Sequence, residues 1–539
     1  MSTHPPASTN YCLIHTFLFA ALAALSCTVV APAGAETAAG GAPPDLDRWV
    51  ERSMQTFEVP GLAVAIVKDG KAVAARGYGV RRLGARAAVD ERTLFGIASN
   101  TKAFTATALG LLVEEGKIEW DGRVVDYLPW FQMWDPYVTR ELTVRDLLVH
   151  RSGLGLGAGD LLWWPASTYD RKEIARRLRY LEPETSFRSA YAYDNVLYIV
   201  AGEVIEAVSG QSWEDFVQSR ILDKVGMSGS NTLHSAVTDG GNVAATHAPV
   251  DGEVRPIAPF TSDNTNAAGG INSSAEDMAK WLEVQLARGQ LPDGERLFSE
   301  ETARELVTVV TPMPIGTPPP ELSELSTSFN GYGLGFGLRE YRGHKLVQHT
   351  GSLPGYVSRV AMIPDAGVGV AVLTNQESRA AYDALVYLIL DHYLGAPEKD
   401  WIGVYEAVTT RQSEKNSGRA ASAQQSRDRS SQPSLPLGEY AGTYTDAWYG
   451  DVTVRYTNGE LAIEFSRSPA LRGPLEHWQH DTFIARWTDR ELRADAFLTF
   501  ALKPDGTVEH AKMRAVSPDT DFSYDFHHLL LVPEATKRR

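Results

Sequence analysis

Two β-hairpin patterns far apart along the chain constrain its fold more than any other feature. In the stretch Gly61–Arg82, two β-rich runs flank an Asp-Gly dipeptide, which is typical of tight hairpin turns. In the stretch Tyr356–Asn375, two further β-rich runs flank a short turn, and Glu377–Leu394 then has the pattern of a long helix. The residues between the hairpins are mostly helical in pattern. The sequence therefore predicts an α/β (α+β) fold, an antiparallel sheet flanked by helices with a helical insertion.

The composition changes twice after this unit, which we place at residues 45–395. Residues 411–434 contain almost no large apolar side chain, so they cannot bury a core, and this predicts a flexible linker. Residues 436–535 contain short alternating strands separated by Asn-Gly and Asp-Gly turns. This last segment is predicted to form a small all-β C-terminal domain.

The N-terminus has the pattern of an export signal. The segment Cys12–Ala35 is apolar and ends in Ala-Gly-Ala, which predicts a signal peptide over residues 1–35 and a periplasmic or secreted protein. No Lys or Arg precedes Arg48, so an uncleaved membrane anchor is an alternative, and lipid attachment at Cys27 is another. Membrane contact is expected only through this segment.

Cysteine and charge exclude several kinds of chemistry. The chain has two cysteines, Cys12 and Cys27, and both lie in the signal segment, so we expect no disulfide and no thiol nucleophile in the mature protein. The formal net charge is −16, which argues against a nucleic-acid partner. The histidines show no metal-ligand spacing such as His-Glu-x-x-His, so no metal site is expected.

A serine and a lysine stand three residues apart at the start of a predicted helix. Positions i and i+3 share a helix face, so Ser99 and Lys102 can touch. A lysine activates a serine as a base only when it is neutral; otherwise it stays charged and lowers the pKa of a second base. By itself the spacing is equally consistent with a helix-start serine beside a surface lysine.

Two further motifs follow in order. Tyr193-Asp194-Asn195 lies in the helical middle, where a tyrosine can act as a base if a cation stabilises its phenolate. His349-Thr350-Gly351 ends a late strand, where the glycine would let a substrate backbone approach the strand edge. Each motif alone also fits an ordinary packing residue or turn.

The three motifs together, with Leu142–Gly155 and Ala267–Leu282, resemble the class C β-lactamase-like branch of the serine β-lactamase and penicillin-binding-protein superfamily. The resemblance covers about Asp45 to Leu394. The C-terminal domain resembles a β-rich domain of unknown function that is often attached to these hydrolases.

The resemblance implies a role for each residue. Ser99 would attack the substrate carbonyl, and Lys102 and Tyr193 would move its proton, with Tyr193 as the base. Asn195 would bind the substrate amide and hold Lys102. The backbone N–H groups of Ser99 and Ser352 would form the oxyanion hole, next to Gly351, and the family needs no cofactor.

One departure from the family pattern affects the substrate. Where many relatives have lysine this chain has His349, which is largely neutral at pH 7 at its usual pKa of about 6.5 and can still hydrogen-bond Tyr193. A weaker attraction for carboxylates makes strong β-lactamase activity less expected. Relatives with His-x-Gly include esterases and D-aminopeptidases or amidases, so the resemblance implies a small ester, amide or peptide as substrate. The alternatives are a β-lactamase or D-Ala-D-Ala carboxypeptidase, and a non-catalytic binding protein with the same fold. The sequence does not indicate an oligomeric state.

Three other residues are weaker candidates for the site. His150 is interpreted as a structural histidine near a helix end, because no paired acid stands near it in the sequence. Trp163 and Trp164 fit either the wall of a substrate pocket or core packing.

Overall fold

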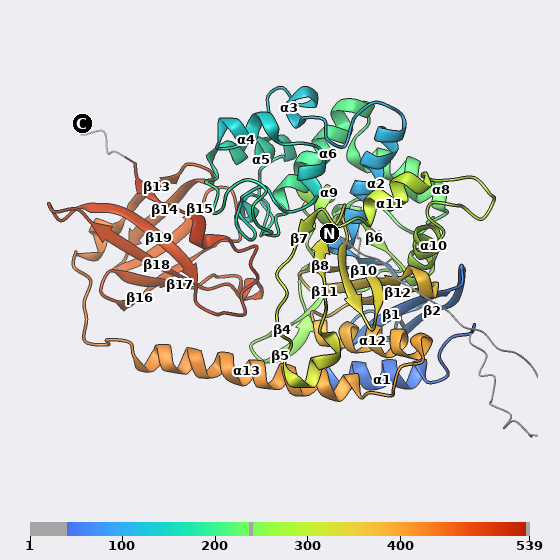
Figure 1. Ribbon diagram of the computed structural model, residues 1–539. Coiled ribbons are helices and arrows are strands. Elements are labelled where there is room, and N and C mark those ends of the chain that lie inside the picture. Colours follow the sequence, from blue (N-terminus) through green and yellow to red (C-terminus); the bar gives the residue numbers. More distant parts are fainter. Residues whose placement is uncertain (1–39, 237–240, 535–539) are drawn as a thin grey trace, which may run out of the picture. The chain divides into compact units, whose positions relative to one another are not determined.

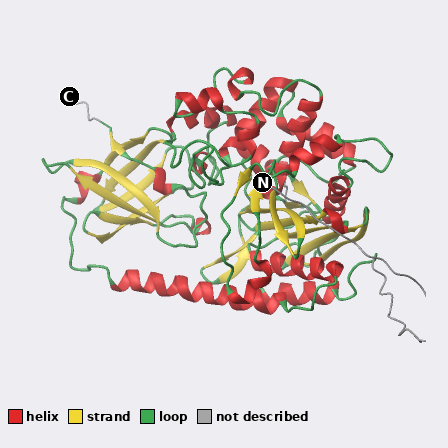
Figure 2. Ribbon diagram, viewed as in Figure 1, coloured by secondary structure: helices red, strands yellow, loops and turns green. Residues whose placement is uncertain are grey.

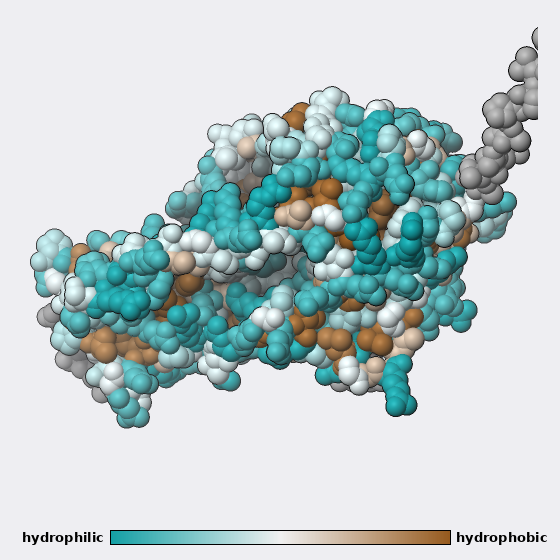
Figure 3. Space-filling model, turned by 90° about the horizontal axis from the view of Figure 1, so that it is seen from below, coloured by the Kyte–Doolittle hydropathy of each residue, from teal (hydrophilic) through white to brown (hydrophobic). Residues whose placement is uncertain are grey.

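The computed structural model describes residues 40–236 and 241–534, and the predicted signal segment 1–35 lies outside them. Within these ranges no helix combines the length and the apolar character needed to cross a membrane. On the face that Figure 3 shows, hydrophilic side chains predominate and hydrophobic ones lie between them in separate patches.

An eight-stranded sheet forms the centre of the N-terminal part (Figures 1 and 2). Its strand order is β2-β1-β12-β11-β10-β9-β8-β7, and neighbouring strands run antiparallel. The strands are β1 (Gly61–Lys68), β2 (Lys71–Gly79), β7 (Thr311–Pro312), β8 (Asn330–Tyr332), β9 (Gly337–Tyr341), β10 (His344–Leu353), β11 (Tyr356–Ile363) and β12 (Val368–Thr374). Strands from both ends of the unit thus meet in one sheet, which confirms the predicted fold.

Both faces of this sheet are covered, and the alternation of side chains along β1 shows how. Leu62, Val64 and Ile66 pack with α1 (Leu46–Thr56) and α12 (Arg379–Leu394) in one core. The intervening Ala63, Ala65 and Val67 belong to the other core. There they lie with helices that include α2 (Thr101–Glu114), α6 (Val196–Ser209) and α10 (Ala275–Leu286). A strand buried on both faces reads as a continuous apolar run, as Gly61–Lys68 does.

The helical insertion lies between β2 and β7. Besides α2, α6 and α10 it contains shorter helices, and it carries Ser99, Lys102, Tyr193 and Asn195. Its other helices are α3 (Val124–Tyr127), α4 (Pro136–Glu141), α5 (Arg171–Arg177), α7 (Trp213–Val217), α8 (Asp223–Val225), α9 (Asn266–Gly269) and α11 (Glu300–Leu306).

The C-terminal domain is a second eight-stranded antiparallel sheet, ordered β19-β18-β17-β16-β15-β14-β13-β20. A bridge between Ala511 and Leu531 links its two ends, so the sheet is nearly closed into a barrel. The strands are β13 (Gly442–Asp446), β14 (Gly450–Thr457), β15 (Glu460–Phe465), β16 (Arg472–Gln479), β17 (Thr482–Ala485), β18 (Ala496–Leu502), β19 (Val508–Ala515) and β20 (Val532–Pro533). The predicted all-β domain is confirmed.

The sequence predicts a flexible linker over residues 411–434, but the first part of this segment is helical. Helix α13 spans Trp401–Gln425 and continues well into this segment (Figure 1). Its first turns are buried at residues such as Trp401 and Tyr405, and beyond them Asn416 alone is buried. Beyond them the helix is rich in Ala, Gln, Glu, Lys and Arg, which form helices without a buried face, and Asn416 donates a 2.5 Å hydrogen bond to Asp519. The lack of large apolar side chains therefore rules out a hydrophobic core in this segment, but it does not rule out a helix.

Candidate active site

Ser99 lies in a short, strained turn at the start of α2. The turn η1 (Ala98–Asn100) leads directly into the helix, and Ala98 has a φ of 49°. A non-glycine residue in this left-handed region costs on the order of 1 kcal/mol, so the surrounding structure must hold it there. The side chain of Asn100 does so in part, because it donates a 2.8 Å hydrogen bond to Ser358 on β11. Ser99 itself is half-buried and lines a cavity.

Lys102 is completely buried one helical turn from Ser99. Its Nζ lies 3.0 Å from Ser99 Oγ, 2.8 Å from Asn195 Oδ1 and 2.9 Å from the carbonyl oxygen of Ala268 on α9. Burial lowers its pKa from 10.5 to about 7, although the nearby carboxylates of Asp160 and Asp194 favour the charged form. The predicted pair of Ser99 and Lys102 is therefore in contact, and the lysine can lose its proton near neutral pH.

A buried carboxyl holds the amide that holds the lysine. Asn195 Nδ2 donates a 2.8 Å hydrogen bond to Asp160 Oδ2. The same oxygen accepts a 2.8 Å bond from Ser523 Oγ, and Trp163 Nε1 donates to Oδ1 at 2.9 Å. Burial raises the pKa of Asp160 to about 8, while these donated bonds favour the carboxylate. Because both nitrogen and oxygen of Asn195 are engaged, its orientation is determined.

Tyr193 lies beside Ser99 but in an environment that disfavours a phenolate. Lys102 Nζ is 5.0 Å from the centre of the Tyr193 ring. Burial raises the Tyr193 pKa well above 10, and the Ser99 hydroxyl offsets this only in part. The pKa values of the free protein therefore favour Lys102 over Tyr193 as the base, in contrast to the role that the sequence resemblance implied for Tyr193.

His349 is neutral, but it does not contact the residue we expected. Its Nδ1 lies 2.7 Å from the carbonyl oxygen of Thr350, to which it must donate, so Nε2 accepts from the Tyr332 hydroxyl at 2.7 Å. The Tyr193 ring is 6.2 Å away, measured between ring centres. Burial and the charge of Lys102 lower the His349 pKa to about 3. The histidine thus hydrogen-bonds Tyr332 in place of Tyr193.

Gly351 is required by the protein's own backbone. A Cβ atom at this position would lie 2.2 Å from the carbonyl oxygen of Ile97 and 2.7 Å from Ser358 Oγ. We predicted that the glycine would admit a substrate backbone, whereas the structure shows that it admits the turn that carries Ser99. Strand β10 pairs with β9 only up to Gln348, so the edge from His349 to Leu353 faces this turn instead of another strand.

The predicted residues surround one cavity of about 280 Å³. Ser99, Tyr193, Asn195, His349, Gly351 and Ser352 all line it. Trp163 and Trp164 line it too, and both also belong to the buried core, so each side chain fits both interpretations. His150 is fully buried; its Nδ1 accepts the Asp194 backbone N–H at 3.2 Å, as expected for a structural histidine.

The C-terminal domain reaches this cavity through residues 521–528. Asp521, Phe522 and Ser523 line it, and the Phe522 ring packs edge-on against Tyr193 with 6.0 Å between ring centres. The next turn is anchored as well, because the backbone N–H of Gly159 donates a 2.7 Å hydrogen bond to Asp525.

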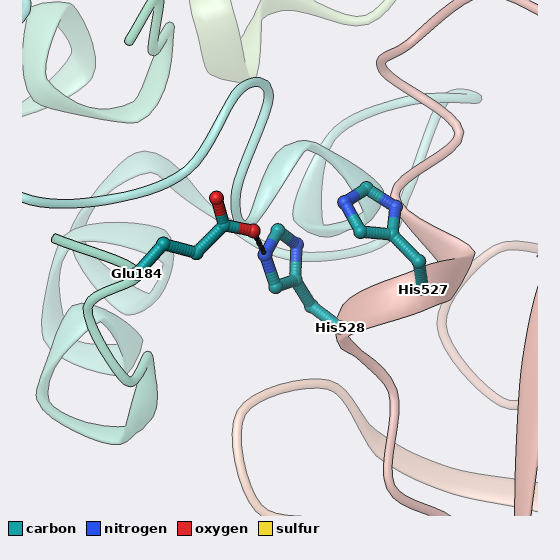
Figure 4. Close-up of side chains that lie close together, drawn as sticks. All are labelled: Glu184, His527 and His528. Carbon is teal, nitrogen blue, oxygen red and sulfur yellow. Dashed lines mark hydrogen bonds and ion pairs between the residues drawn. The ribbon is translucent and has the colours of Figure 1, made fainter. Parts of the chain in front are cut away.

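A histidine completes this anchor. His528 Nε2 lies 2.7 Å from Glu184 Oε1 (Figure 4). Its Nδ1 contacts Asp525. Burial lowers the His528 pKa, but the two carboxylates raise it more, to about 9. His527 is close enough for three metal ligands to gather here. An imidazolium with both nitrogens engaged cannot ligate a metal, so the cluster is explained as a charge-assisted contact.

Sequence reasoning missed the residues that act on the site from a distance. Asp160 stands in the stretch Gly159–Pro165, beside the two tryptophans, and the one local signal for it is an acid that precedes an apolar run. Ser523 and Phe522 carry no local signal, because they belong to a separate domain and reach the site only through the tertiary fold.

Comparison with known proteins agrees with this architecture. The sheet, the helical insertion and the Ser-x-x-Lys pair define the chain as a member of the serine hydrolase superfamily. The β-lactamase family model matches residues 46–393, so the chain belongs to that family, and residues 426–533 match a domain of unknown function, DUF3471.

Among curated relatives, the unguisins hydrolase of Aspergillus violaceofuscus is 28% identical over 495 residues, which cover 86% of this chain and 86% of that protein. Penicillin-binding protein 4 of Amycolatopsis lactamdurans is 29% identical, covering 62% of this chain and 86% of that protein.

Two solved structures share the fold. The octameric penicillin-binding protein homologue from Pyrococcus abyssi aligns with a TM-score of 0.57 and 24% identity, covering 90% of this chain and 99% of that chain. The D-amino acid amidase from Ochrobactrum anthropi, complexed with L-phenylalanine amide, aligns with a TM-score of 0.53 and 23% identity, covering 65% and 98%.

Proposed function

We propose that this protein hydrolyses an ester or amide through an acyl-enzyme on Ser99, as an esterase or a D-aminopeptidase or amidase. The observation that carries the proposal is the contact between Ser99 Oγ and a buried lysine whose pKa is about 7. A neutral amine has two N–H groups and one lone pair. Donation to Asn195 and to the Ala268 carbonyl uses both N–H groups and leaves the lone pair directed at Ser99.

The reaction would proceed in two halves. Lys102 takes the Ser99 proton as Oγ bonds to the substrate carbonyl carbon, and the backbone N–H groups of Ser99 and Ser352 bind the oxyanion. The proton then passes to the leaving amine or alcohol as its bond to carbon breaks, and Tyr193, a neutral phenol, is placed to relay it. Water next attacks the acyl-enzyme, gives a proton to Lys102, and Ser99 leaves with that proton.

The neutral state of His349 supports esters and amides without a carboxylate as the substrate class. His349 is neutral, so it offers no cation for a substrate carboxylate. Relatives named as an unguisins hydrolase and a D-amino acid amidase support amide or peptide cleavage.

Arg379, at the start of α12, also lines the cavity. This cation favours a second candidate, a β-lactamase or carboxypeptidase whose substrate carries a carboxylate. Nitrocefin turnover with a kcat/KM equal to that for p-nitrophenyl acetate would favour this candidate.

Labelling tests the nucleophile directly. A fluorophosphonate probe is expected to add the mass of one probe molecule to the protein and none to Ser99→Ala. This variant should also lose p-nitrophenyl acetate hydrolysis while its circular dichroism is unchanged. Equal labelling of the variant would refute the assignment, and no labelling of either protein would support a non-catalytic binding protein.

A further inference from the structure

A second, larger cavity adjoins the one that contains Ser99. Its volume is about 550 Å³, against about 280 Å³ for the first. The residues that line both cavities are Trp164, Ser352, Leu353, Arg379, Asp521 and Phe522. The two cavities are therefore neighbours that share these residues as a common wall.

The second cavity has walls from two domains. One wall contains Ala166 and residues 257–261, and the other contains Ala470, Asp489 and residues 491–493 and 518–522 of the C-terminal domain. Hydrogen bonds and ion pairs join the two walls. Arg493 makes two contacts of 2.6 Å with the carboxylate of Glu377. Glu491 accepts a 2.8 Å hydrogen bond from the backbone N–H of Ala258. These contacts make the cavity a built feature of the fold.

One side of the interior, formed by aromatic and aliphatic side chains, is suited to apolar groups. Trp164 stacks on Phe260, with 5.6 Å between ring centres, and Tyr524 lies edge-on to Trp164 at 6.2 Å. Ile257 and Leu353 add aliphatic surface. Charged residues form much of the remaining lining: Glu377 and Arg493 pair with each other, and the others are Arg379, Asp489, Glu491, Asp519 and Asp521. Ligand sites are commonly lined by aromatic and aliphatic side chains with a few polar groups among them.

The volumes set the size of the substrate. A cavity of about 280 Å³ lies at the lower end of the range of ligand pockets, which is roughly 300–1,000 Å³. It suits the group that Ser99 attacks and little more. The adjoining space has room for the rest of a longer molecule.

We propose that the second cavity binds an extension of the substrate, a chain of apolar residues attached to the group that Ser99 attacks. The substrate class would then be apolar peptides longer than a single amino-acid derivative, and the C-terminal domain would select them by supplying half of the binding surface. This inference rests on the proposed hydrolase function, but its test measures binding and does not require turnover.

The test uses Ser99→Ala full-length protein and calorimetry with three amides: D-Phe amide, Leu-Leu-D-Phe amide and D-Phe-Leu-Leu amide. These extend the same residue on its acyl side or on its leaving-group side. We expect at least one tripeptide amide to bind tenfold or more tightly than D-Phe amide. Ala166→Trp and Ala470→Trp, which add bulk from opposite walls, are each expected to remove this gain.

The matched control is Ala420→Trp, on the exposed surface of α13, which should leave the gain unchanged. All three tryptophan variants should keep the circular dichroism spectrum and the thermal unfolding midpoint of the Ser99→Ala protein, which shows that they fold. Equal binding of the three amides, or a gain that survives both cavity substitutions, would overturn the proposal. If the unsubstituted protein fails to hydrolyse p-nitrophenyl acetate while both cavity substitutions remove the binding gain, only the hydrolase function is overturned.

Discussion

Lowering the pH through 7 is expected to switch off hydrolysis, because Lys102 must be neutral to take the proton of Ser99. Burial lowers the lysine pKa from 10.5 to about 7, which corresponds to about 5 kcal/mol against the ammonium form. With that pKa, about half of the protein carries a neutral lysine at pH 7, about a tenth at pH 6 and about a hundredth at pH 5.

The assay is kcat/KM for p-nitrophenyl acetate between pH 5 and pH 10, corrected for spontaneous hydrolysis. We expect a tenfold fall per pH unit below pH 6 and a plateau above pH 8. Lys102→Met should remove the pH-dependent activity while Ser99 remains in place.

A base other than Lys102 would give a different profile. Burial raises the Tyr193 pKa well above 10, so a Tyr193 phenolate would make the rate climb tenfold per unit up to pH 10. A log-linear rise between pH 8 and pH 10 would therefore refute the assignment of the base to Lys102.

Stability provides a second readout of the same group. Between pH 7 and 10.5 the unfolded chain binds a proton at this lysine that the folded protein lacks, so the free energy of unfolding contributed by Lys102 rises with pH. Lys102→Met should abolish this part of the pH dependence.

Three further predictions concern the surroundings of the site. His528→Gln should lower the free energy of unfolding by about 1–2 kcal/mol at pH 6, allowing for solvent screening, because Asp525 and Glu184 raise the histidine pKa to about 9. Since that contribution is present below pH 6.5 and lost as the pH rises through 9, urea titrations at pH 6 and pH 9.5 should differ, and equal losses would contradict it. Gly351→Ala should lower kcat for p-nitrophenyl acetate at least 100-fold, because its Cβ would displace the carbonyl of Ile97; an active variant would show that the Ser99 turn adapts. Ser523→Ala removes one of three donors to a buried carboxyl, which costs about 1–3 kcal/mol. Its kcat should fall while KM changes little, and an unchanged kcat would separate the C-terminal domain from the chemistry.

Local patterns were sufficient wherever a structure depends on neighbouring residues. The first hairpin turns at Asp69 and Gly70, which have φ values of 49° and 75°, the positive values that an Asp-Gly turn accommodates. The apolar run after it could be predicted as a buried strand, and Ser99 and Lys102 could be placed on one helix face. Helix α13 shows the limit of this reasoning, because a lack of apolar residues says that a segment is not core and does not say whether it is helical.

By itself, then, the sequence determined the two sheets, the helical insertion and the order of three motifs, because each depends on periodicity or on turn chemistry. The tertiary structure decided what the motifs can do. Ser523 lies 363 residues from Asp160 in the sequence, and no local pattern encodes that contact. The pKa of Lys102 is likewise a tertiary property, since it depends on how completely the folded chain removes the amine from water.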